Sequence, residues 1–75
     1  MSEVELKHRT CVYDKGTIAL DRQTGGWSYR LVYVNDVGET IVSSDGEYYV
    51  SWQAARANAW LAYERETGER MQGDV

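Results

Sequence analysis

His8 and Cys11 are the residues of this sequence whose side chains could act as a general base and a nucleophile. The chain has one histidine and one cysteine, and no His/Cys/Asp cluster has the spacing of metal ligands. On a β-strand, residues three positions apart point to opposite faces, which disfavours a direct Cys–His dyad. We therefore expect His8 to be an exposed strand residue and Cys11 to be a buried structural thiol.

Glu39 and Glu47 could in principle work as paired carboxylates, because hairpins bring strand residues together. A small domain seldom has the cleft that such catalysis needs, so a solvated edge explains these two side chains better. The pair Gly25-Gly26 lacks the downstream lysine and serine or threonine of a phosphate loop and is interpreted as a loop. The sequence thus predicts no catalytic residue, no metal site and no cofactor, and we expect that the protein is not an enzyme.

Acidic residues dominate the segment from Leu31 to Ala55, which contains no lysine and no arginine. Its acids are Asp36, Glu39, Asp45 and Glu47. The whole chain has a formal net charge of −4. Direct binding of nucleic acid needs a basic patch, and none is apparent. An acidic surface would attract a basic partner, although acidic turns can also serve only to keep a small protein soluble.

The size and composition indicate one small folded domain. The chain has 75 residues, of which 43% are hydrophobic and 12% aromatic, and this composition argues against disorder. We expect an ordered core over about residues 4–68 and a flexible tail over 69–75. A single cysteine cannot form an internal disulfide, and the sequence has neither a secretory signal nor a membrane-spanning apolar run. These features predict a cytoplasmic protein.

Short strands with short connections are expected to position the acidic residues. Strand-like patterns cover 4–14, 15–21, 27–35, 40–44 and 47–50. In the clearest of them, Trp27, Tyr29, Leu31 and Tyr33 share one face, which we expect to be the core. Asp45-Gly46 is a hairpin signal, and the adjacent Tyr48 and Tyr49 must point to opposite faces. The pattern predicts an antiparallel meander of three to five strands.

One helix is expected over 52–67, with Ser51 as its N-cap and Gly68 as its C-terminal stop. One apolar face is formed by Trp52, Ala55, Ala59, Ala62 and Tyr63. A second apolar strip on the opposite side is formed by Ala54, Ala57 and Leu61. One face must cover the sheet, which makes the fold class α+β, and the strip that remains is a candidate second interface.

Two resemblances add to this interpretation. The segment from Gly25 to Ala59, with its aromatic strand, "GETIVSS", tyrosines and alanine-rich helix, resembles the small bacterial YegP-like domains (domain of unknown function 1508). That resemblance implies a β-β-β-α topology. In size, acidic balance and lack of a catalytic constellation, the whole chain resembles the small phage-encoded inhibitors called anti-CRISPR proteins. This second resemblance implies an inhibitor that occupies the DNA-binding or PAM-reading surface of a type I Cascade subunit.

The sequence therefore favours an acidic protein-binding inhibitor that mimics the charge of nucleic acid. Its candidate partner-binding residues are Asp36, Glu39, Asp45, Glu47 and Tyr48. The expected partner is a basic nucleic-acid-binding protein, in the host cytoplasm if the chain is phage-encoded, with no direct contact to nucleic acid or membrane. The alternative is a homo-oligomeric structural or interaction module of YegP-like type with no inhibitory role. We expect a monomer or a weak homodimer.

Overall fold

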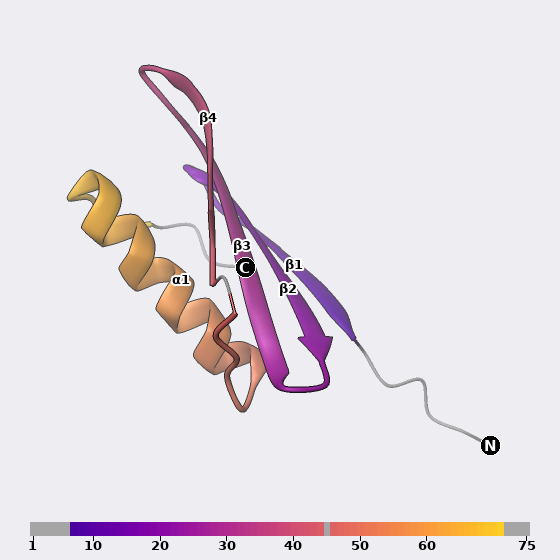
Figure 1. Cartoon of the computed structure of the whole chain (residues 1–75). Helices are drawn as coiled ribbons and strands as arrows, with labels where there is room; N and C mark the ends of the chain where they lie inside the picture. Colours follow the sequence, from indigo (N-terminus) through magenta and orange to yellow (C-terminus); the bar gives the residue numbers. More distant parts are fainter. Residues whose placement is uncertain (1–6, 45, 72–75) are drawn as a thin grey trace.

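Four strands and one helix form the part of the chain that the structure, a computed structural model, describes: residues 7–44 and 46–71. The elements are β1 (His8–Val12), β2 (Gly16–Gln23), β3 (Gly26–Asn35), β4 (Gly38–Ser43) and α1 (Trp52–Thr67). The strands make one antiparallel sheet in the order β1-β2-β3-β4, so each strand pairs with its neighbour in the sequence (Figure 1). The predicted α+β meander with one covering C-terminal helix is confirmed, with four strands.

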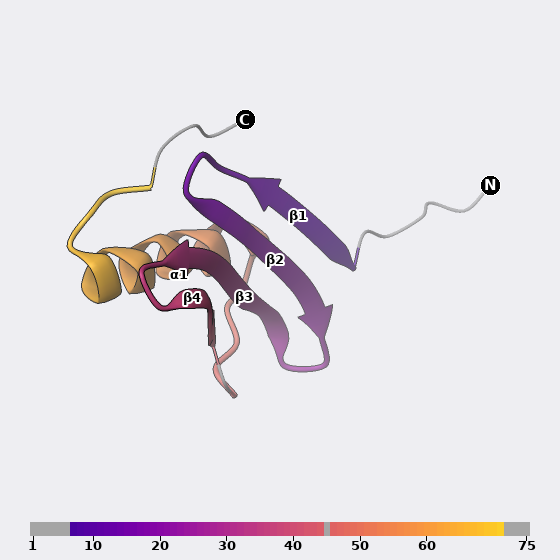
Figure 2. The same cartoon turned by 90° about the horizontal axis from the view of Figure 1, so that it is seen from above.

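Tight turns join the strands. Two residues, Thr24 and Gly25, separate β2 from β3, and Asp36 and Val37 separate β3 from β4. The Asn35 side chain accepts a hydrogen bond from the Val37 N–H at 3.0 Å and so closes the second of these turns. Because β1–β2 and β3–β4 both turn at the end of the sheet that α1 runs toward, two turns and the helix C-terminus share one end of the molecule (Figure 2).

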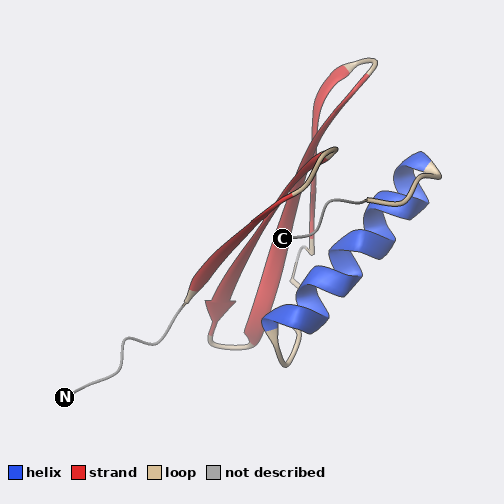
Figure 3. Cartoon of the chain, turned by 180° about the vertical axis from the view of Figure 1, so that it is seen from behind, coloured by secondary structure: helices blue, strands red, loops and turns tan. Residues whose placement is uncertain are grey.

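The core lies between one face of the sheet and α1 (Figure 3). The predicted aromatic face of β3 is buried, and Leu31, at its centre, has no exposed surface. Of the two apolar helix faces, between which the sequence did not decide, the buried one carries Ala55, Ala59, Ala62 and Tyr63. Small alanines let the helix approach the sheet closely, and the Tyr33 and Tyr63 rings meet edge to face at 5.1 Å.

Both ends of α1 are capped as the sequence predicts. The Ser51 hydroxyl accepts a hydrogen bond from the Ala54 N–H at 3.1 Å. Gly68 is left-handed, with φ 75°, and its N–H donates to the Glu64 carbonyl at 2.7 Å. Beyond it, Met71 is only 8% exposed and belongs to the core. The packed chain therefore continues past the predicted limit at residue 68, whereas residues 72–75 lie outside the described part.

The predicted hairpin at Asp45-Gly46 and the strand over 47–50 are wrong. Tyr49 forms a single bridge to Trp27, with both backbone hydrogen bonds at 2.8 Å. The β4 register pairs Arg30 with Ser43, and its regular continuation would pair Trp27 with residue 46. Trp27 pairs instead with Tyr49, so the chain contains three extra residues before it returns to β3. The edge strand thus bulges outward and then returns to β3 rather than reversing direction.

Packing explains why the chain returns to β3. The Tyr49 ring stacks on Tyr29 at 6.2 Å, so this return adds an aromatic side chain to the core. Gly26 allows the contact, because its φ is 127° and a Cβ at this position would lie 2.6 Å from the Tyr49 carbonyl oxygen. Asp45 itself lies outside the described residues.

The first strand is shorter in the described residues than the predicted 4–14. It covers His8–Val12, and residues 4–6 are not described. His8 is exposed, as predicted, and points to the face of the sheet opposite to that of Cys11. Cys11 is half-buried and packs against the core, so the direct dyad that the strand spacing disfavours does not form.

Candidate functional site

The predicted acidic residues fall into two groups at the two ends of β4. Asp36 and Glu39 lie together at the β3–β4 turn, where Asn35 faces Gly38. Glu47 follows the other end of β4. A six-residue strand is about 20 Å long, so the two groups are separated by roughly that distance. The structure does not describe Asp45, the remaining acid.

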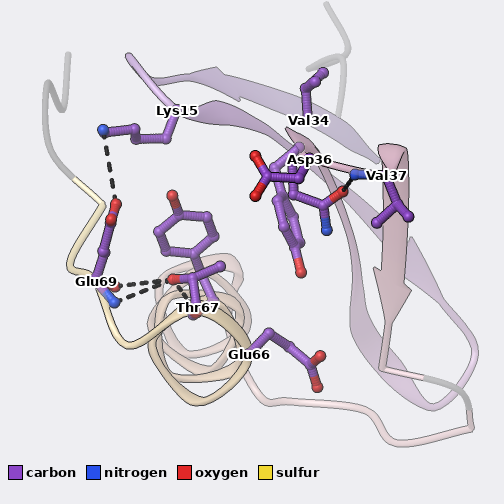
Figure 4. A pocket seen from close by; sticks show the side chains of 10 residues that line it. Lys15, Val34, Asp36, Val37, Glu66, Thr67 and Glu69 are labelled. Carbon is purple, nitrogen blue, oxygen red and sulfur yellow. Dashed lines mark hydrogen bonds and ion pairs between the residues drawn. The ribbon is translucent and has the colours of Figure 1, made fainter.

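At the β3–β4 turn, the helix adds a further carboxylate, Glu66, that was not among the predicted site residues. Asp36, Glu66 and Glu69 line an open hollow of about 510 Å³ together with Lys15 (Figure 4). Glu69 is paired, since its Oε1 lies 3.7 Å from the Lys15 Nζ. Glu66 could have been found from its spacing, because it lies three residues after the core residue Tyr63 and therefore shares its side of the helix.

We use the term acidic end for Asp36, Glu39 and Glu66. All three side chains are exposed. Among the described residues, the ion pairs of the structure join other groups: His8 with Asp21, Lys15 with Glu69, and Arg70 with Glu64. The acidic end therefore carries carboxylates that no cation of the described chain neutralises, and they come from two elements that the core holds in place.

The field of the acidic end reaches the core residue Tyr33, which also lines the hollow. Burial raises the pKa of the Tyr33 phenol, and the neighbouring Glu66 carboxylate and Tyr63 raise this pKa further. The phenol therefore stays protonated and can act only as a neutral hydrogen-bonding group at physiological pH.

Glu47 and Tyr48 lie at the opposite end of the sheet, and both have local partners. The Tyr49 hydroxyl donates to the Glu47 Oε1 at 3.2 Å. Tyr48 is 44% exposed, and its ring packs on the β2–β3 turn, where a Cβ at Gly25 would lie 2.9 Å from a ring carbon. Tyr48 thus faces solvent while Tyr49 packs against the core.

This opposite end also carries cations. Lys7 and Arg22 line a further hollow together with Gln23 and Thr24, and the Tyr48 hydroxyl donates to the Gln23 side chain at 3.4 Å. Glu47 therefore stands in a region of mixed charge. Of the predicted acidic residues that the structure describes, Asp36 and Glu39 belong to the acidic end and Glu47 does not.

Stacked arginine and tryptophan side chains join β1 to α1, and they were not among the predicted site residues. The Arg9 guanidinium lies 4.1 Å from the centre of the Trp52 ring, and Arg56 lies between Trp52 and Trp60 at 5.0 and 4.6 Å. Cation–π contacts of this kind hold the edge strand to the helix. The spacing of residues 52, 56 and 60 is visible in the sequence, but Arg9 joins them only through the fold.

His8 has partners that only the strand register supplies. His8 faces Asp21 across β1 and β2, with Nδ1 at 2.6 Å from Asp21 Oδ1 and Nε2 at 3.0 Å from Thr10 Oγ1. The order of groups is that of an acid–base–hydroxyl triad. Acyl transfer also needs oxyanion donors in a site that excludes water, whereas the His8 and Asp21 side chains are 60% and 48% exposed. We interpret the group as a polar link between two strands.

The second helix strip presents one large apolar side chain to solvent. Leu61 is 55% exposed, Ala57 is exposed, and Ala54 is half-buried. A single exposed leucine is ordinary for a small protein.

Comparison of the chain with protein-family models, with curated proteins and with solved structures found no match. Within residues 7–44 and 46–71, no group of three or more His, Cys, Asp or Glu side chains is arranged to hold a metal ion. In the same part of the chain, no helix has the length and apolar character needed to span a membrane.

Proposed function

We propose that this chain is a small acidic binding protein, an inhibitor of the anti-CRISPR type, whose acidic end occupies a basic nucleic-acid-binding groove of another protein. One observation supports the proposal above the others. Asp36 and Glu66 line one hollow whose cation, Lys15, pairs with Glu69, and Glu39 lies at the same end of the molecule on the sheet face that points away from α1.

Rigidity makes these carboxylates suitable for recognition. Asp36 lies in a two-residue turn that the Asn35 side chain closes, and Glu66 is on a capped helix that packs on β2 and β3. A partner therefore loses little of its binding free energy to ordering this surface. Arginine and lysine side chains of a groove can form charge-assisted hydrogen bonds with the carboxylates in place of phosphates.

Apolar side chains at the same end would add contact area. Val37, in the turn, is 92% exposed, and Val34 is 74% exposed. Glu47 and Tyr48 lie about 20 Å away along β4, a length that corresponds to about six nucleotides at ~3.4 Å each. They would supply a secondary contact if the groove extends along the edge strand.

The anti-CRISPR resemblance narrows the proposed partner to a type I Cascade subunit, and the proposed contact is the surface that reads the PAM or binds DNA. Inhibition would then follow from occupancy, because the DNA and the acidic end compete for the same cations. No chemical step is required of the protein.

A competition assay tests this proposal. Labelled duplex DNA with a PAM is bound to purified Cascade, and the chain is titrated in at about 50 and about 300 mM salt while fluorescence anisotropy is recorded. We expect the chain to displace the DNA, with a weaker effect at the higher salt concentration. Displacement that is independent of salt, or no displacement at either concentration, would contradict the proposal.

Two double variants with the same change in net charge supply the control. D36N/E66Q neutralises two unpaired carboxylates, and D21N/E64Q neutralises two that are paired with His8 and Arg70 and lie outside the hollow. We expect the first variant to bind at least about 10-fold more weakly and the second to bind within a few-fold of the unaltered chain. Equal losses would show that only net charge matters and would overturn the assignment of the acidic end.

A further inference from the structure

The face of the sheet that points away from α1 is covered by no element of the described chain (Figure 3). The strand register aligns four of its residues in one line across all four strands. They are Val12, Thr17, Val32 and Ile41. Val12 is 59% and Ile41 58% exposed. We call this line the apolar row, and the face that carries it the open face.

A cation and an anion flank the apolar row on opposite sides. Arg30 precedes Val32 by two residues on β3, so it lies on the open face one step along the strand. Glu39 precedes Ile41 by two residues on β4 and faces Val34, which places it one step along in the other direction. Both side chains are exposed. They are too far apart to pair within the chain, because Arg30 faces Ser43 while Glu39 faces Val34.

We propose that the open face binds a second copy of this chain, with a two-fold axis that runs along the apolar row. Rotation about this axis stacks the apolar row on its own copy and keeps each strand over the same strand of the second chain. The positions on either side of the row exchange. Arg30 then lies opposite Val34 of the second copy. Glu39 of that copy lies beside its Val34 on the neighbouring strand, about 4.8 Å away.

Charge complementarity decides between this arrangement and the other symmetric one. An axis along the strands would place β3 over β2 of the second copy, with Arg30 opposite Ala19 and near Asp21, a carboxylate that already pairs with His8 in its own chain. An axis along the apolar row instead forms the Arg30–Glu39 pair twice. Sheets pack face to face about 10 Å apart, and the arginine and glutamate side chains are long enough to bridge that gap.

The resulting dimer has two sheets in the middle and one helix on each outer side. Its two acidic ends point in opposite directions, because the rotation reverses the strands. Asp36 and Glu66 stay accessible, whereas Glu39 pairs with Arg30 of the second copy in the dimer. The dimer therefore goes beyond the proposed inhibitory function and does not depend on it. It also assigns self-association to the sheet rather than to the helix strip that the sequence suggests.

Sedimentation equilibrium of the purified chain, from about 10 µM to about 1 mM, tests the dimer. We expect a species of twice the 8.6 kDa chain mass at the upper concentrations. The variant I41K is expected to raise the dimer dissociation constant at least about 10-fold. The matched control is L61K, since Leu61 and Ile41 are 55% and 58% exposed, and it should leave the constant unchanged.

A monomer at every concentration would overturn the proposal. So would a dimer that L61K weakens and I41K does not, because that result would assign the interface to the helix. Far-ultraviolet circular dichroism of each variant checks that the fold is intact, and V12K serves as a second disruption of the apolar row if I41K does not fold.

A charge exchange tests the geometry. R30E and E39R should each raise the dissociation constant, since each brings two like charges together across the interface. The double variant R30E/E39R restores opposite charges and should return the constant to within a few-fold of the original value. Because the two residues do not pair within one chain, such a rescue can come only from contacts between chains. A double variant as weak as the single variants would overturn the two-fold arrangement.

Discussion

The two faces of β3 differ in their side chains and in what they pack against. On the covered face, Tyr29 and Leu31 are buried under an alanine-rich helix. On the open face, Arg30 is exposed and Val34 is 74% exposed, with no element above them in the described chain. Alternation in the sequence distinguishes the faces, but the partner layer decides which face becomes core. A face with β-branched residues can therefore remain available for association while the aromatic face stabilises the fold.

The largest effect is expected from alkaline pH, because three phenols of the covered side respond together. Burial is the main cause that raises the pKa of Tyr29, Tyr33 and Tyr49 above 10.0. The unfolded chain loses these protons near pH 10 while the folded chain retains them. Their stabilisation is therefore complete below about pH 10 and is lost as the pH rises through the pKa values of the folded state. The register places no tyrosine on the open face.

Urea unfolding followed by tryptophan fluorescence measures this effect at several values between about pH 8 and about pH 11. We expect a constant midpoint up to about pH 10 and a progressive fall above it, in parallel with tyrosinate absorbance. A midpoint that falls before any tyrosinate forms would assign the loss to other groups. A midpoint unchanged at the highest pH would contradict the burial of these phenols.

The next effect compares neighbouring residues on opposite faces. Leu31→Ala removes a side chain with no exposed surface and should lower the free energy of unfolding by about 2–5 kcal/mol. Val32 lies on the open face and its side chain is half-buried, so Val32→Ala should lower the free energy of unfolding by less than about 1 kcal/mol. Both are measured by urea unfolding at low micromolar concentration, where a weak dimer does not contribute. Similar losses for the two variants would mean that the open face is covered in solution.

The smallest effect concerns the helix that separates the two faces. Ser51→Ala removes the hydroxyl that caps the Ala54 N–H and should cost about 1 kcal/mol of stability. Ser43→Ala, at an exposed position of β4, is the matched control and should change stability by less than about 0.5 kcal/mol. Thermal unfolding by circular dichroism at 222 nm compares the two variants. A control variant as unstable as Ser51→Ala would remove the argument from capping.

Much of the fold could be predicted because its signals are local. The alternation from Trp27 to Val34 identified the clearest strand, and Ser51 and Gly68 marked the helix termini that the structure has. The candidate site was harder to predict. Asp36 and Glu39 were found from composition, whereas Glu66 joined them because the helix C-terminus returns to the β3–β4 turn. Arg9 meets Trp52 because of where the helix lies on the sheet, and Asp21 meets His8 because of the strand register. No short segment of the sequence encodes either contact.

The sequence alone determined the two-layer α+β architecture, the aromatic face of the sheet and the uneven distribution of charge. These properties depend on residue types and on periods of two and 3.6 residues, which act over a few neighbours. The tertiary structure decided that residues 47–50 return to β3 instead of forming a hairpin, and that the predicted acids divide between two ends. Both outcomes follow from contacts between distant segments, such as Tyr49 with Tyr29 and Trp27, whose free energy outweighs the local turn preference.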